Sequence, residues 1–156
     1  QKTAYEIPKR DWSSDVCSSD LAKKIMNAAV TKGGKEIDVV IASNDGTAGG
    51  AIQALQEDGL AGKVLVTGQD ADLAACQRIL RGTQAMTIYK PLKNLAELAA
   101  RVAVGVARGE PPATNGTTDN GSRAVPTIME RIISVDRSNL QATVVADGFH
   151  RAADLK

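Results

Sequence analysis

Asn44, Asp70 and Lys90 each follow a short apolar run of the chain, and together they offer a useful hydrogen-bonding chemistry. An amide donates and accepts hydrogen bonds, a carboxylate accepts them from neighbouring hydroxyl groups, and an ammonium donates to hydroxyl or ring oxygens. This set suits a neutral polyol. The same residues also suit helix caps and turns, and Asp70 could begin the helix that follows it. The pattern alone leaves both interpretations open.

The apolar runs before these residues are typical of strands buried on both faces of a sheet, because they are short and rich in β-branched residues. The predicted strands are 37–43, 63–68 and 84–90. Apolar residues at helical spacing predict helices around them. These helices are 22–32, 46–59, 72–81 and a long one from Pro91 to Gly109, whose apolar face carries Leu95, Ala99, Val102, Ala103 and Val106.

Helices that alternate with strands through short connections predict a parallel sheet with right-handed crossovers. The expected fold class is therefore α/β, a three-layer lobe over residues 22–110. In an open parallel sheet, ligands bind beyond the carboxyl ends of the strands. Asn44, Asp70 and Lys90 should converge at that edge. After Pro112 the chain becomes polar and turn-rich, and residues 127–135 and 143–149 are predicted to be extended, the first of them an unpaired edge.

Other polar residues near the helix starts do not predict catalysis or metal binding. Asp45 is expected to cap helix 46–59, and Asp70 and Asp72 also flank a helix start, where acids are common. The segment GTAGGA (46–51) is neither a dinucleotide-binding nor a Walker A motif. His150 is the single histidine and is expected at the surface or in a hinge. The sequence thus predicts no catalytic residue, no metal ligand and no cofactor.

Composition excludes several classes of partner. The chain has 156 residues, of which 43% are apolar and 24% charged, and its net charge of +1 gives no reason to expect nucleic acid. No apolar run approaches the roughly 18 residues of a membrane span, so no direct membrane insertion is expected. Cys17 and Cys76 lie far apart, and Cys76 falls on an apolar helix face, which predicts a buried thiol.

The first 21 residues are predicted to be a non-native or unreliable leader. Residues 11–21, DWSSDVCSSDL, have no helical or strand period and repeat Ser-Ser-Asp. Back-translation of Asp15–Leu21 can give GACGTGTGCTCTTCCGATCT, which looks like the end of a sequencing adapter. The competing interpretation is a loop rich in Ser and Asp.

Four segments resemble the xylose-binding members of the type I periplasmic binding proteins, which serve sugar ABC transporters. The segments are SNDGTAGGAIQAL (43–55), GKVLVTGQDADLA (62–74), GTQAMTIYKPL (82–92) and TVVADGFH (143–150). The resemblance extends over residues 22–155. Ribose-type relatives share the Asn-Asp and Gly-x-Asp patterns but typically carry Gln in place of Lys90.

The resemblance implies a protein of two α/β lobes joined by three hinge segments that close on a sugar. Residues 22–110 would be the second lobe, residues 111–156 a hinge-crossing and carboxy-terminal extended segment, and the first lobe would be missing. Asn44, Asp70 and Lys90 would hydrogen-bond the sugar. The stacking tryptophan of the family is not assigned to Trp12, which lies in the suspect leader.

By the same resemblance, the function is that of a non-enzymatic, periplasmic component of an ABC sugar importer. Its ligand would be xylose or a similar aldose, and its protein partner a membrane permease. Two alternatives share the fold class, which does not decide function. A ligand-sensing domain of a lactose-repressor-type transcription factor would need a helix-turn-helix headpiece upstream. A doubly wound α/β enzyme would need a catalytic constellation.

Overall fold

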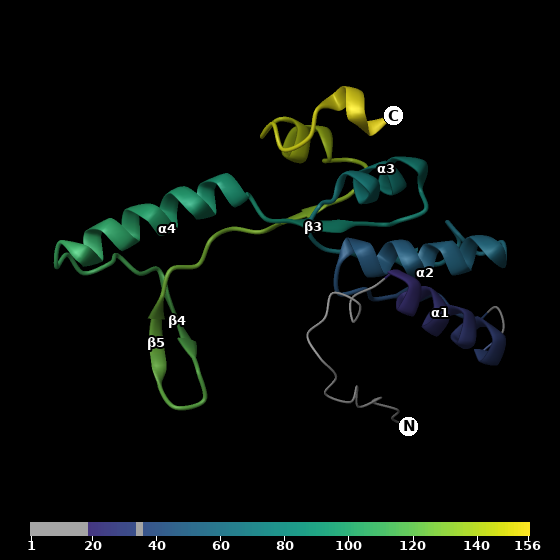
Figure 1. Ribbon diagram of the computed structural model, residues 1–156, viewed down its shortest axis with the longest axis horizontal. Helices are drawn as coiled ribbons and strands as arrows, with labels where there is room; N and C mark the ends of the chain where they lie inside the picture. The colour runs from purple at the N-terminus through teal and green to yellow at the C-terminus, as the bar shows by residue number, and fades with distance from the viewer. Residues whose placement is uncertain (1–18, 34–35) are drawn as a thin grey trace.

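A computed structural model of the chain describes residues 19–33 and 36–156 (Figure 1). Most of the predicted leader, residues 1–18, lies outside this part of the chain. Its last residues, Ser19–Leu21, belong to the first turn of helix α1 (Ser19–Gly33). The proposed adapter origin of residues 11–21 therefore stays a prediction.

Helices and strands alternate as expected through the first half of the described chain. After α1 come β1 (Val39–Val40), α2 (Asp45–Glu57), β2 (Leu65–Val66), α3 (Leu73–Arg81) and β3 (Thr87–Tyr89). The strands are shorter than the predicted 37–43, 63–68 and 84–90. A strand extends only as far as its hydrogen-bonded partner, and an apolar run does not reveal how far that pairing continues.

The strands pair in parallel, which confirms that prediction for β1 and β2. Val39 pairs with Leu65 and Val40 with Val66. The segments of β2 and β3 are also joined, because the N–H of Ile88 donates to the carbonyl of Gly68 and the carbonyl of Ile88 accepts from the N–H of Asp70. In a parallel pair, one residue bonds through its N–H and its carbonyl to the two residues on either side of the residue opposite it, as Ile88 does here.

Two apolar clusters hold the helices against one face of these strands. The first joins α1 and α2 to the strands through Met26, Val30, Ile52, Leu55, Val64 and Val66. Gly50 permits the contact of α1 with α2, since a Cβ there would overlap the backbone of Ser19. The second includes Cys76 and Ile79 of α3, Tyr89 of β3, and Val135. Cys76 is fully buried, as predicted, and burial raises the pKa of its thiol to about 11.

The opposite face of β1 and β2 is open to solvent. Val39 and Leu65, which pair across the two strands, are 49% and 58% exposed, and Ile41 is 87% exposed. Val40 and Val66, one residue further along, face the first cluster instead. In the described part of the chain, therefore, helices cover β1 and β2 from one side.

After β3 the chain leaves this packed region. Helix α4 (Leu92–Ala107) extends away from α1, α2 and α3, and a hairpin of β4 (Gly116–Asp119) and β5 (Ala124–Thr127) follows it (Figure 1). None of the residues of α4 is buried. We call residues 92–131 the arm and the other described residues the body. The apolar face predicted for this helix is present, but it does not pack against the body.

The chain returns to the body as β6 (Ile133–Val135), which pairs antiparallel with β3. Tyr89 lies opposite Ile133, and Thr87 opposite Val135. The prediction of an unpaired edge over 127–135 is therefore wrong: residues 133–135 pair with β3, and Thr127 pairs with Gly116 in the hairpin. Local sequence pattern does not show that one edge of β3 is available to pair with β6.

The predicted extended segment 143–149 is also wrong. Residues Gln141–Val145 form a short π-helix (η1), and a 3₁₀ turn (η2, Ala152–Leu155) ends the chain. The β-branched run Thr143-Val144-Val145 favours a strand locally. Tertiary packing overrides this preference, because Leu140 and Val144, four residues apart, are both fully buried in the second cluster. None of the helices in the described ranges combines the length and apolar character that a bilayer span requires.

Candidate functional site

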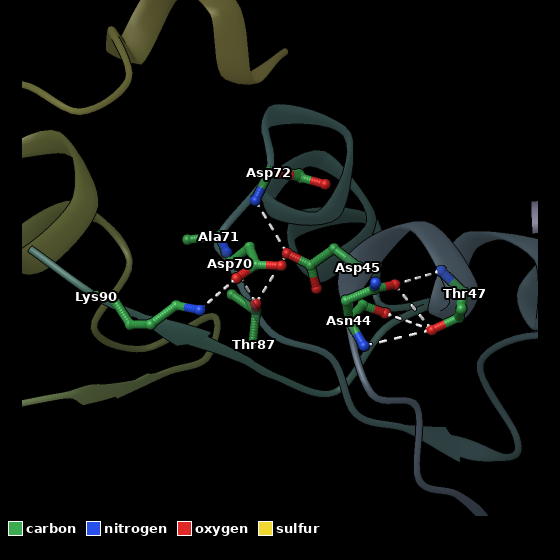
Figure 2. A network of polar contacts seen from close by, with 8 residues as sticks. All are labelled: Asn44, Asp45, Thr47, Asp70, Ala71, Asp72, Thr87 and Lys90. Carbon is green, nitrogen blue, oxygen red and sulfur yellow. Dashed lines mark hydrogen bonds and ion pairs between the residues drawn. The ribbon is translucent and has the colours of Figure 1, made fainter. Parts of the chain in front are cut away.

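Asp70 and Lys90 form the most direct contact among the three predicted site residues. Lys90 Nζ lies 2.6 Å from Asp70 Oδ1, and their side chains are 37% and 41% exposed, respectively. Asp70 follows the β2 segment and Lys90 follows β3, so two separate strand ends bring the charges together (Figure 2). Because both side chains are partly exposed, a ligand can approach the pair.

Asn44 caps helix α2 and does not bond to the ion pair. Its Oδ1 accepts from the N–H of Thr47 at 2.8 Å, and its own N–H donates to Thr47 Oγ1 at 3.3 Å. This reciprocal arrangement is a capping box. Within the described chain, Asn44 Nδ2 has no hydrogen-bond acceptor, so the amide retains a donor for a ligand. The cap expected at Asp45 is thus one residue earlier.

The backbone around Asp70 adopts an unusual conformation. The φ angles are +103° at Asp70 and +54° at Ala71, although neither residue is glycine. Side chains with a Cβ rarely occupy this region, and such residues persist only where the surroundings hold them. The N–H of Asp70 donates to the carbonyl of Ile88 at 2.9 Å, and the N–H of Ala71 donates to Thr87 Oγ1 at 3.1 Å.

Asp45 lies at the centre of the contacts that hold this loop. It is 1% exposed. Its Oδ1 accepts from Gln84 Nε2 at 2.8 Å. Its Oδ2 accepts from Thr87 Oγ1 and from the N–H of Asp72, each at 2.9 Å (Figure 2). Burial raises the pKa of this carboxyl, and the hydrogen bonds from Gln84, Asp72 and Thr87 oppose the rise.

Arg78 of α3 completes the network from the other side. Its Nη2 donates to the backbone carbonyl of Asp45 at 2.8 Å, and its Nε donates to Gln84 Oε1 at 2.9 Å. A Cβ at Gly49 would come 3.2 Å from Arg78 Nη1. Gly49 and Gly50 of GTAGGA therefore serve close packing, Gly49 against Arg78 and Gly50 against α1.

Sequence reasoning missed this buried network. The run 84–90 predicts a strand and gives no polar role to Gln84 or Thr87, although a Thr or Gln within an apolar run is a signal that a buried partner exists. His150 lies against the same loop, with Nε2 2.8 Å from the carbonyl of Ala71. It is neither buried nor fully exposed. Among the described residues, no group of His, Cys, Asp and Glu is arranged to hold a metal ion.

The sequence pattern of the periplasmic binding protein domain matches residues 2–111, well over half of the chain. The chain belongs to this family. Its relatives include the D-xylose-binding periplasmic protein of Escherichia coli K12, 50% identical over 134 residues, which cover 86% of this chain and 41% of the relative. The protein of the same name from Haemophilus influenzae is 48% identical over 132 residues, or 85% of this chain and 40% of the relative.

Solved structures support the same fold. A carbohydrate transporter solute-binding protein from Chloroflexus aurantiacus, in complex with D-glucose, has a TM-score of 0.79 and 33% identity, covering 87% of this periplasmic binding protein chain and 41% of its own. An ABC transporter solute-binding protein from Clostridium phytofermentans with bound β-D-glucose has a TM-score of 0.77 and 28% identity, covering 90% and 45%. The expected α/β fold of type I periplasmic binding proteins is confirmed. The chain spans about two-fifths of the length of the curated relatives it matches.

Proposed function

We propose that this chain is part of the sugar-binding component of an ABC importer and that it holds a xylose-like monosaccharide in the periplasm. The observation that carries the proposal is the Asp70–Lys90 pair, in which two strand ends present a carboxylate and an ammonium that remain accessible. Asn44 Nδ2, which has no acceptor among the described residues, would add a donor. The 50% identity to a D-xylose-binding periplasmic protein supports the same ligand class.

The chemistry of the pair fits a neutral ligand with many hydroxyl groups. The Asp70 carboxylate can accept from adjacent hydroxyls while the Lys90 ammonium donates to others or to a ring oxygen. The two charges neutralise each other at 2.6 Å, so the site does not require a charged ligand. Hydrogen bonds to charged groups are also stronger than neutral ones. These groups bind and orient a sugar, and the proposal includes no reaction and no cofactor.

The arm and the open face of the sheet support a larger, two-lobed protein. Four large apolar side chains of α4 are exposed: Leu92, Leu95, Val104 and Val106. Val39, Ile41 and Leu65 on the open face of the sheet are exposed as well. Exposed apolar side chains that are grouped in this way mark surfaces that another part of a protein covers, whereas single exposed ones do not. We propose that parts of a longer chain cover both surfaces. The packing favours a lobe boundary at Lys90 rather than at residue 110, because none of the residues of α4 is buried.

The permease partner follows from this function and rests on the class of the relatives rather than on a surface of this chain. The two alternatives, a sensing domain of a repressor and a doubly wound enzyme, have no observation in their favour. The described site lacks a buried nucleophile beside a base. The named relatives and structural neighbours are sugar-binding and transport proteins.

A chimera tests the proposal. The part of the Escherichia coli protein outside the matched 134 residues would be joined to this chain, and xylose binding measured by calorimetry. We expect binding by the chimera and no measurable binding by the 156-residue chain at micromolar concentrations, since half of the contacts are lost. Asp70→Ala should weaken the chimera about 100-fold, because a hydrogen bond to a charged group contributes about 1.5–3 kcal/mol.

Glu57→Ala provides the matched control. Glu57 is an acidic residue at the opposite end of α2 from Asn44, where it pairs with Lys23 on the surface. This variant should leave xylose affinity unchanged. Tight binding by the 156-residue chain alone, or full affinity in the Asp70→Ala chimera, would refute the proposed site.

A further inference from the structure

The geometry points to Asp45 as a positioning residue: a buried carboxylate that holds Asp70 in the orientation needed to bind a sugar. The inference rests on the proposed function and adds a residue that does not itself reach the ligand. Asp45 is 1% exposed, whereas the Asp70 side chain is 41% exposed. The two therefore have different tasks within one loop cluster.

The loop at Asp70 needs an external hold because its backbone is strained. Two consecutive residues with a Cβ, Asp70 and Ala71, have positive φ angles. Such a conformation is unfavourable for a residue with a Cβ and persists only where the surrounding structure holds it. Left alone, the segment would relax and turn the carboxylate of Asp70 away from Lys90. Strain of this kind gathers at binding sites, where the rest of the structure supports it.

Asp45 fixes the loop on both sides of the strained pair. On one side, its backbone N–H donates to the carbonyl of Gln69 at 2.9 Å. On the other, its Oδ2 accepts from the N–H of Asp72 at 2.9 Å. Between them, the N–H of Ala71 donates to Thr87 Oγ1, and the Thr87 hydroxyl in turn donates to Asp45 Oδ2 (Figure 2). The residues within and after the strained pair thus depend on the Asp45 side chain, and the residue before it depends on the Asp45 backbone.

The network accepts a carboxylate at this position and rejects an amide. Both oxygens of Asp45 receive hydrogen bonds, and Gln84 cannot turn its amide to receive one because its Oε1 is held by Arg78 Nε. In Asp45→Asn, the new NH₂ group must face a donor. If it faces Asp72, the bond that follows the strained pair is lost; if it faces Gln84, two NH₂ groups oppose each other. Gln84→Glu in the same molecule would remove that second conflict, since the introduced carboxylate can accept from both the introduced amide and Arg78. It gives up the bond that Gln84 Nε2 donates to the carbonyl of Met86, so the rescue is partial.

The first experiment needs no sugar. Amide hydrogen exchange in the 156-residue chain should show the N–H groups of Ala71 and Asp72 exchanging at least tenfold faster in Asp45→Asn, relative to that of Thr67 in the same molecule. Thr67 donates to the carbonyl of Val40 and is independent of Asp45. The control is Ile52→Val or Ile52→Ala, whichever matches the loss of global stability. Ile52 is buried in the first cluster, away from the loop.

The second experiment measures xylose affinity in the chimera. Asp45→Asn should weaken binding at least tenfold, the matched Ile52 variant less than twofold, and Asp45→Asn with Gln84→Glu should recover part of the loss. Unchanged affinity in Asp45→Asn, or an equal loss in the Ile52 control, would overturn the positioning role. If the parent chimera binds no sugar, the proposed function fails; the exchange experiment then decides the role of Asp45, and unchanged protection of Ala71 and Asp72 refutes it.

Discussion

The body and the arm have similar apolar sequence patterns but bury very different amounts of surface. Helix α2 contains seven buried residues, among them Ile52 and Leu55, whereas the longer α4 contains none. Both helices are continuous and both have an apolar stripe. An apolar stripe at helical spacing therefore predicts the helix but not the surface that will cover it. In this molecule the difference separates a region that is packed by its own neighbours from one that presents its apolar side chains to solvent.

Thiol reactivity should show the largest difference between the two regions. In a Cys17→Ser, Val104→Cys variant, we expect Cys76 to react with a thiol reagent at pH 8 at least about 100-fold more slowly than the cysteine at position 104, because the thiolate is the reacting form. Cys76 is fully buried with a pKa of about 11, and Val104 is 50% exposed. Peptide mass spectrometry measures both rates in one sample. In denaturant the two rates should become equal; equal rates in the native protein would contradict the comparison.

Truncation of a leucine should affect the body far more than the arm. Leu55→Ala should lower the free energy of unfolding by about 3 kcal/mol, because Leu55 is fully buried and its removal leaves a cavity. Leu95→Ala should change it by less than about 0.5 kcal/mol, since Leu95 is 46% exposed. Urea unfolding of the two variants measures both values. A large loss in Leu95→Ala would indicate that α4 is covered in solution.

Hydroxyl removal sharpens the comparison at the level of polar contacts. Thr87→Val should destabilise the protein by about 1–3 kcal/mol, because the N–H of Ala71 loses its acceptor and Asp45 Oδ2 loses a donor. Thr118→Val makes the same chemical change in the hairpin, where Thr118 accepts from Thr127 in an exposed contact. Its effect should lie within about 0.5 kcal/mol. Similar losses in the two variants, measured by urea unfolding, would refute the assigned difference in burial.

The smallest expected effect is the pH dependence that Asp45 contributes to the body. Burial raises the pKa of this carboxyl in the folded state, so the folded protein takes up the proton before the unfolded chain does as pH falls. The cost of the buried charge is present at neutral pH and is relieved between the folded pKa and about 3.9, the usual aspartate value. Asp72, Cys76 and Arg78 are the other titratable groups close to it.

The wild type should therefore gain stability relative to Asp45→Asn as the pH falls from 7 to 4. Urea unfolding midpoints of the two proteins at several pH values measure the difference. A shift in the opposite direction would mean that the hydrogen bonds from Gln84, Thr87 and Asp72 outweigh burial.

Local pattern predicted the elements of the body better than their connections. The helices, the parallel pairing of β1 with β2 and the positions of Asp70 and Lys90 at strand ends follow from periodicity and from the geometry of parallel sheets. The pairing of β3 with β6 did not, because it joins residues far apart in sequence through backbone groups. The helical turn at Gln141–Val145 was hidden by β-branched residues, whose preference yields to burial.

The contact between Asp70 and Lys90 was predictable from the sequence, and the buried residues that hold the Asp70 loop were not. The charged side chains of Asp70 and Lys90 indicate a polar role from sequence alone. Asn44 is recognisable because it precedes a helix. Asp45 also precedes a helix in sequence, so a cap was the simplest interpretation, and nothing local distinguishes a capping carboxylate from a buried one. The positive φ angles at Asp70 and Ala71 likewise have no sequence signal, since neither residue is glycine. Both features arise from contacts between three separate loops.

The pairing of Tyr89 with Ile133 means that the chain leaves the body and returns to it at the same place. The arm, residues 92–131, is thus inserted between two adjacent strands, and Lys90 stays with the body. Insertions with neighbouring ends can be exchanged, lengthened or replaced without changing the path of the chain on either side. The arrangement is modular: a different arm could be grafted between β3 and β6, and the graft would leave Asp45, Asp70 and their loop untouched.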